Sequence, residues 1–234
     1  MDKIPLDFPL AARRVLGALA GFDPPWSLSG RAALGCWLSG VPRPIGQLDF
    51  VWHGLDRLGA LHGQIVRTLV GAGLDVATLH GDSRRVWLGA GYGKSACLLS
   101  LTAEPGLPLA PPRETRLAGV AVTVDALREV IAATLCSLYE RPGLQDLENT
   151  GLLLRNGFSL DQGLEDACDR IADLVPLDFA LRLACFAVEG PDLSEIALER
   201  FRRYQERVVV KILAWAADAT IPARPSCRSP RAAH

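Results

Sequence analysis

Apolar and polar positions follow different patterns in the two halves of the chain. In the first half, short apolar runs between glycines and prolines predict strands, and stretches with apolar residues three or four apart predict helices. The predicted strands are residues 26–29, 47–52, 74–80, 84–90 and 95–101, and the predicted helices are residues 9–19, 31–38 and 55–70. Only short glycine-containing turns separate the last three strands, which therefore predict an antiparallel meander.

The second half begins after a proline-rich connection, residues 102–116, which favours irregular structure and a domain boundary. Beyond it only helical periodicity recurs, and the predicted helices are residues 123–140, 144–154, 159–174, 177–188 and 192–217. We predict an α+β fold in which a mixed sheet with flanking helices, residues 1–116, precedes an all-helical region, residues 117–218. Residues 219–234 combine prolines with arginines and predict a disordered basic tail.

Composition and charge argue against a membrane partner and leave a nucleic-acid partner open. The chain has 234 residues, is 49% hydrophobic and carries a formal net charge of −1, so no bulk charge attracts nucleic acid. No apolar run approaches the ~20 residues that span a bilayer. The first residues contain Asp2, Asp7 and an arginine pair, which is not typical of a secretory signal. Six isolated cysteines agree with a reducing compartment, and we predict a cytoplasmic protein without a membrane partner.

The first candidate site combines a glycine turn with an acidic strand. Ser29 and Gly30 end a predicted strand and open a helix, where free backbone N–H groups can bind phosphate oxygens. Asp49, in the next strand, could hold a divalent cation that bridges those phosphates. Gln47 projects to the same face, where a second aspartate would complete a cation site. In a second interpretation, Asp49 forms an ion pair with Arg43 or Arg31 and binds no metal.

At these motifs the chain resembles the AbiEii/AbiGii nucleotidyltransferase toxins of the abortive-infection type. Their first motif reads roughly GG(T/S)AL, and here Ser29 and Gly30 stand at the glycines and Arg31 at the hydroxyl residue. Arg31 would either bind a phosphate bidentately or fill the site with its own ion pair. The second motif reads roughly RxSxDxD, and Gln47 and Asp49 stand at its aspartates. Its arginine corresponds to Arg43.

A third stretch extends the resemblance into the helical half. The family typically carries a helix reading AxKLxALxxRxxxRDLxDL, and Arg141 and Asp146 match two of its charged positions. Thr134, Gln145 and Asn149 replace its lysine, second arginine and second aspartate. Apolar positions thus persist in all three stretches while charged positions are replaced.

The resemblance implies a bacterial transferase of a toxin–antitoxin system that uses Mg²⁺ and a nucleoside triphosphate. It also implies a third carboxylate on a later strand, but residues 95–101 offer only Ser95 and Ser100. One hypothesis is therefore a degenerate, catalytically impaired protein that binds a nucleotide or a partner, such as a cognate antitoxin, and needs no cofactor. The alternative is an active toxin in which Asp49 acts in catalysis and transfers a nucleotidyl group to RNA, protein or a small acceptor.

Two further features favour structural roles. His53, His62 and His80 have no acidic or cysteine partner at metal-ligand spacing in the sequence, so isolated packing or surface histidines are the favoured interpretation. The stretch ERFRRYQER, residues 199–207, is dense in arginine and glutamate and is typical of a solvated helix face.

Overall fold

The structure is a computed structural model that describes residues 7–41, 44–189 and 193–219. The chain divides into two compact units, Met1–Val130 and Ile131–His234, and each is described by itself. The predicted basic tail lies outside the described residues, except for the backbone of residue 219. Within the described part of the chain, no helix has the combined length and apolar character that crossing a membrane requires.

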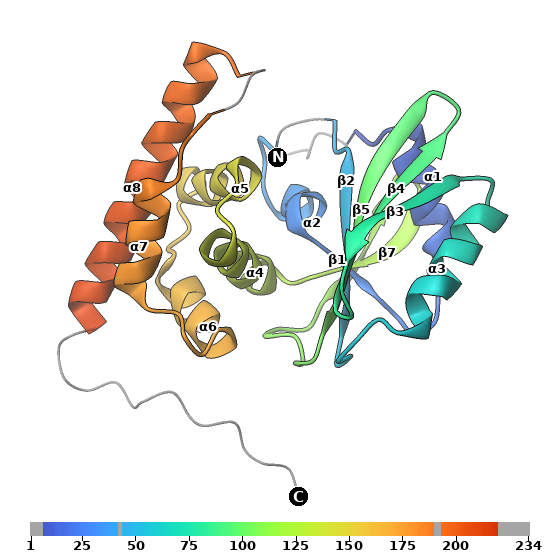
Figure 1. Ribbon diagram of the computed structural model, residues 1–234, viewed down its shortest axis with the longest axis horizontal. Coiled ribbons are helices and arrows are strands. Elements are labelled where there is room, and N and C mark those ends of the chain that lie inside the picture. Colours follow the sequence, from blue (N-terminus) through green and yellow to red (C-terminus); the bar gives the residue numbers. More distant parts are fainter. Residues whose placement is uncertain (1–6, 42–43, 190–192, 220–234) are drawn as a thin grey trace, which may run out of the picture. The chain divides into compact units, whose positions relative to one another are not determined.

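The first unit is built on a seven-stranded mixed sheet (Figure 1). The strands are β1 (Ser27–Ser29), β2 (Gln47–His53), β3 (Asp75–Gly81), β4 (Arg85–Tyr92), β5 (Ser95–Glu104), β6 (Arg113–Leu117) and β7 (Val120–Val124). Their order in the sheet is β3-β4-β5-β2-β1-β7-β6. β2 runs parallel to β5 and antiparallel to β1, and β3, β4 and β5 form the predicted antiparallel meander. The predicted mixed sheet with flanking helices is therefore confirmed.

One face of the sheet is apolar because the central strands alternate. Leu48, Phe50 and Trp52 of β2 are buried, whereas the residues between them are partly exposed. Helices α1 (Leu10–Leu19) and α3 (Ala60–Gly71) contact β3, β4 and β5 and each other, and Figure 1 shows them on one side of the sheet. The opposite face of β2 carries three polar side chains, Gln47, Asp49 and His53, together with Val51.

The second unit consists of helices. α4 (Leu127–Glu140) begins in the first unit and continues into the second, where α5 (Leu144–Arg155), α6 (Asp161–Arg170), α7 (Pro176–Cys185) and α8 (Glu195–Ala219) follow. α8 packs against α5 and α7 through a buried stripe whose members recur every three or four residues: Phe201, Tyr204, Val208, Ile212 and Trp215. The prediction that helices follow the sheet is confirmed, and they begin at Leu127 and not at residue 117.

The structure corrects two local predictions between the halves. Residue Thr123, predicted to begin a helix, lies in β7, and α4 begins only at Leu127. The proline-rich connection is shorter than predicted because β5 extends to Glu104 and β6 begins at Arg113. The predicted boundary between residues 116 and 117 thus falls within β6, and the two units divide after Val130.

Candidate functional site

The glycine turn between β1 and α2 (Gly30–Trp37) brings the start of a helix against Asp49. Ser29 lies directly opposite Asp49 in the β1–β2 register and is buried. Gly30 adopts φ +58°, a left-handed conformation that favours glycine. A Cβ at this position would overlap the Asp49 Oδ2, so only glycine permits this close approach. The predicted arrangement of strand, glycine turn and helix is present.

Gln47 and Asp49 share one face of β2 and are hydrogen-bonded to each other. The Gln47 side-chain amide donates to Asp49 Oδ1 at 2.7 Å. The two Asp49 oxygens thus face an amide donor and the Gly30 backbone. In β5, Ser100 lies opposite Asp49 and is buried, so a hydroxyl stands beside the carboxylate on that strand.

This donor set does not fit a two-metal site of the kind that nucleotidyl transfer uses. Two divalent cations need several charged oxygen ligands, and Mg²⁺ is usually held by more than one carboxylate together with phosphates. Gln47 and Ser100 supply neutral groups, and the Gln47 amide places an N–H against one of the Asp49 oxygens that a cation would bind. Asp49 and these neighbours therefore do not supply the ligands that two divalent cations need.

A second polar cluster lies at the other end of β2. His53 Nε2 is 3.0 Å from Asp125 Oδ1, and the Ser27 hydroxyl donates to the same oxygen. Glu129, in the first turn of α4, completes the cluster, and its Oε2 accepts the Leu109 N–H at 2.8 Å. Asp125 and Glu129 are 1% and 2% exposed, so two carboxylates are buried beside one imidazole.

The buried carboxylates change the pKa of His53. Burial of the imidazole lowers its pKa. The hydrogen bond to Asp125 and the charges of Asp125, Glu129 and Glu104 raise the pKa and together outweigh burial. The net result is a pKa above the ordinary value of histidine. A protonated His53 neutralises part of the negative charge in the cluster.

The His53 cluster is also a possible metal-ligand set. His53, Asp125 and Glu129 each offer one ligand atom, and these atoms lie within 4.8 Å of one another. One imidazole and two carboxylates suit zinc or another first-row transition metal. Among the described residues this is the only such group of three, and Asp49 is not part of it. Asp49 and His53 are four positions apart in β2, about 13 Å along a strand, so the two cannot share a cation.

Among the other predicted site residues, Arg31 directly follows Gly30, whereas the rest lie in the second unit or outside the described residues. Arg31 lies in the first turn of α2 and is partly exposed, while Arg43 lies outside the described residues. Arg141 directly follows α4, and Asp146 lies in the first turn of α5, in the second unit. The structure therefore brings together Ser29, Gly30, Gln47 and Asp49, whose role in binding stays a prediction.

Sequence reasoning missed the His53 cluster. Its members come from β2, from the residue after β7 and from α4, so 72 positions separate His53 from Asp125. The interpretation of His53 as an isolated histidine is wrong. The one available signal was the acidic pair at positions 125 and 129, four apart at a helix start, and this spacing alone names no partner.

Comparison with known proteins supports the fold. No family model and no curated protein matches the chain. Among solved structures, the chain is similar to MenT4, a nucleotidyltransferase toxin from Mycobacterium tuberculosis, with a TM-score of 0.57 and 16% identity. The alignment covers 89% of this chain and 82% of that chain.

Two other structures are similar with lower scores. ANT(2")-Ia in complex with adenylyl-2"-tobramycin has a TM-score of 0.47 and 17% identity, over 66% of this chain and 92% of that chain. JHP933 from Helicobacter pylori has a TM-score of 0.45 and 18% identity, over 88% and 92% of the two chains. The likeness to MenT4 shows a nucleotidyltransferase-like fold, as predicted, and at this identity it concerns the fold alone.

Proposed function

We propose that the chain is a degenerate nucleotidyltransferase-like protein of the AbiEii/AbiGii type that binds a nucleotide without transferring its nucleotidyl group. The observation that carries the proposal is the hydrogen bond from the Gln47 amide to Asp49 Oδ1. At this position the family's second motif has an aspartate, whose charged oxygens would bind a cation. An amide beside Asp49 instead satisfies the carboxylate by hydrogen bonding, which removes the need for a metal.

The glycine turn supports binding in the absence of this chemistry. Gly30 holds the first N–H groups of α2 next to β2, and such groups bind phosphate oxygens through their partial positive charge. Arg31 follows directly and can supply a guanidinium to the same phosphate. These contacts use backbone and a permanent cation, so they require no Mg²⁺. A cognate antitoxin or other protein is a further candidate ligand of the same polar face.

The alternative is an active toxin in which Asp49 holds Mg²⁺ with the triphosphate of the substrate. The close approach of Gly30 to Asp49 favours it, because the phosphate-binding turn and the remaining acid are adjacent. In that case a nucleotidyl group would pass to RNA, protein or a small acceptor, as the resemblance implies. The two functions differ in their requirement for Mg²⁺ and for the Asp49 charge.

Thermal unfolding with each of the four nucleoside triphosphates tests the proposal. A ligand at a hundred times its Kd stabilises by about 2.7 kcal/mol, a measurable upward shift. We expect at least one nucleotide to stabilise the protein equally with Mg²⁺ and with a chelator, and Asp49→Asn to retain this response. Arg31→Gln should weaken it, whereas Arg57→Gln, a change at an exposed arginine, should not.

Three results would contradict the proposal or favour the alternative. If no nucleotide shifts the transition under any condition, nucleotide binding is wrong. If the shift requires Mg²⁺ and is lost in Asp49→Asn, the Asp49 carboxylate binds a cation and the active-toxin alternative is favoured. If a nucleotide labelled at its α-phosphate transfers the label to RNA, protein or a small acceptor, and Asp49→Asn abolishes the transfer, the protein is an active nucleotidyltransferase.

A further inference from the structure

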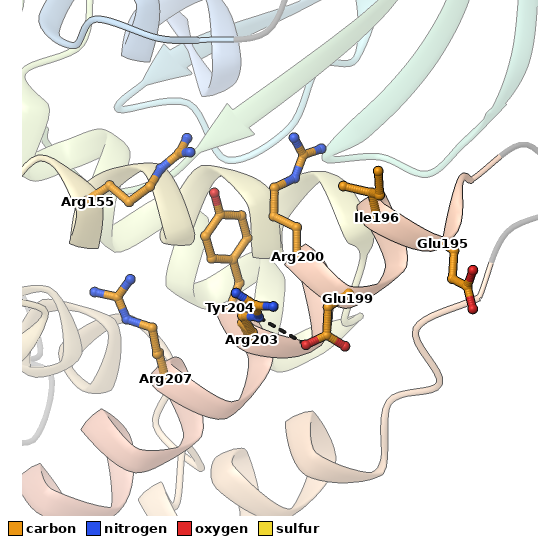
Figure 2. Close-up of a pocket in the computed structure, with 8 residues that line it drawn as sticks. All are labelled: Arg155, Glu195, Ile196, Glu199, Arg200, Arg203, Tyr204 and Arg207. Carbon is orange, nitrogen blue, oxygen red and sulfur yellow. Dashed lines mark hydrogen bonds and ion pairs between the residues drawn. The ribbon is translucent and has the colours of Figure 1, made fainter.

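A pocket of about 560 Å³ lies in the second unit, along α8 and the C-terminal end of α5 (Figure 2). This volume is typical of small-molecule sites. Arg155 is the last residue of α5, and Arg200, Arg203 and Arg207 recur at three- and four-residue spacing on α8. The three arginines of α8 share one helix face, and together with Arg155 of α5 they line one space, which we call the arginine pocket.

Tyr204 forms the base of the arginine pocket. The residue is 5% exposed, and its ring lies directly against Gly151 of α5, where a Cβ would come within 2.5 Å of the ring. The Arg155 guanidinium carbon is 5.4 Å from the ring centroid, a cation–π contact that orients the side chain. Figure 2 shows the Tyr204 hydroxyl pointing to the side on which the guanidinium groups of Arg155 and Arg200 lie.

Positive charge in the arginine pocket is only partly compensated. Arg203 pairs with Glu199 at 3.0 Å, and Arg200 is 3.4 Å from Glu148 of α5. Glu195 also lines the pocket. Within the described part of the chain, Arg155 and Arg207 have no carboxylate partner. On a solvated helix face, as the sequence predicted, most arginines would form ion pairs like Arg203–Glu199 with acids three or four residues away. Arg155 and Arg207 differ from this pattern: both line the pocket and neither is paired with an acid of the described chain, so both can bind a ligand.

We propose that the arginine pocket binds a small phosphate-bearing anion, with Arg155 and Arg207 as its main ligands. A guanidinium presents a planar pair of N–H donors that matches two phosphate oxygens, and such charge-assisted hydrogen bonds are stronger than neutral ones. A phosphate or pyrophosphate group has enough oxygens to accept from two arginines on different helices at once. The Tyr204 ring holds Arg155 in place before binding, which reduces the entropy lost when the anion binds.

Calorimetric titration of the full chain with sodium pyrophosphate, in a chelator, tests this site. The wild type should bind saturably, and the double variant Arg155→Gln/Arg207→Gln should raise the Kd roughly tenfold or more, the equivalent of one lost charge-assisted hydrogen bond. The matched control is Arg202→Gln, an exposed arginine of α8 outside the pocket, whose Kd should stay within about twofold of the wild type. Unchanged circular dichroism would show that all variants fold.

Titration with ATP distinguishes the two sources of such an anion. The proposal holds for an inorganic anion if pyrophosphate binds at least as tightly as ATP, and for a nucleotide phosphate if ATP binds more tightly. In both cases the Arg155/Arg207 variant must lose affinity. The proposal is overturned if the wild type does not bind pyrophosphate saturably, if Arg202→Gln loses as much affinity, or if Arg31→Gln alone abolishes binding. The last result would place the anion at the Gly30 turn and leave the proposed function standing.

Discussion

The two ends of β2 carry polar side chains on one face of the same strand, in different surroundings. At the start, Asp49 is partly exposed and is hydrogen-bonded by a neutral amide 2.7 Å away. At the end, His53 lies beside Asp125 and Glu129, both of which are buried. The end where the sequence predicted a cation site has one carboxylate beside a neutral amide, whereas the other end has three titratable groups.

The comparison shows that charged groups at one end of β2 can help to hold the fold together, while the end predicted to bind a metal has few of them. Burying Asp125 and Glu129 has a high free-energy cost unless protons, hydrogen bonds or a metal ion compensate it. His53, Ser27 and the Leu109 N–H supply that compensation in the structure. The Asp49 carboxylate needs less compensation for burial, because it is partly exposed and Gln47 donates a hydrogen bond to one of its oxygens.

Removing the Asp125 carboxylate should give the largest effect. Asp125→Ala leaves the Ser27 hydroxyl and the His53 imidazole without their shared acceptor, and it leaves Glu129 buried beside them. We expect a loss of about 3 to 5 kcal/mol in the free energy of unfolding, measured by urea denaturation. Asp56→Ala, at an exposed aspartate of the same unit, should change stability by less than about 0.5 kcal/mol. Equal losses in the two variants would show that the His53 cluster is not structural.

The other end of β2 is tested through Gly30. Gly30→Ala forces a side chain into φ +58° and against Asp49 Oδ2, and should cost about 2 to 4 kcal/mol of unfolding free energy. In the double variant with Asp49→Ala, the overlap is relieved while the backbone strain remains, so part of the loss should return. Gly46→Ala, where a Cβ has nothing within 4 Å, is the matched control. If Gly30→Ala and Gly46→Ala lower the free energy of unfolding by the same amount, the close approach of Gly30 to Asp49 is wrong.

Strands and helices followed from the sequence wherever apolar spacing was regular. The alternation of Leu48, Phe50 and Trp52 predicted β2, and its opposite face correctly placed Gln47 and Asp49 side by side. The domain boundary predicted from the prolines between β5 and β6 is misplaced. The irregular segment covers only residues 105–112, and the sheet continues beyond it with β6 and β7. Local composition predicts a loop, but it does not show whether the chain joins the same sheet again after the loop.

The candidate site was only half accessible to sequence reasoning. Spacing along one strand brings Gln47 to Asp49, and a single turn brings Gly30 to the same place. His53 and Asp125 meet because β1 pairs with both β2 and β7, a topology that no local pattern encodes. Likewise, Arg155 and Arg207 line one pocket only because α5 packs against α8.

Introducing an acid at position 47, where the resembled family carries an aspartate, should sharpen the contrast. Gln47→Asp replaces a hydrogen bond with two neighbouring carboxylates, so in a chelator we expect a loss of about 1 to 2 kcal/mol in the free energy of unfolding. Mg²⁺ should recover part of this loss by bridging Asp49 and the new carboxylate. Gln47→Ala removes the hydrogen bond without adding charge, and its stability should not respond to Mg²⁺. An equal response of both variants to Mg²⁺ would place the cation elsewhere.

The smallest expected effect is a pH dependence from His53. Its pKa is raised in the folded protein because Asp125, Glu129 and Glu104 outweigh the effect of burial. The resulting stabilisation is fully present below the unfolded pKa of about 6.5, and it is lost as the pH rises through the higher folded value. His53→Gln lacks this contribution, so its loss of stability relative to the wild type should be greater at about pH 5.5 than at about pH 9. His80→Gln, an exposed histidine stacked on Trp87, controls for histidines in general. A stability difference between wild type and His53→Gln that stays constant across this range would mean that His53 does not carry the proton that balances the buried carboxylates.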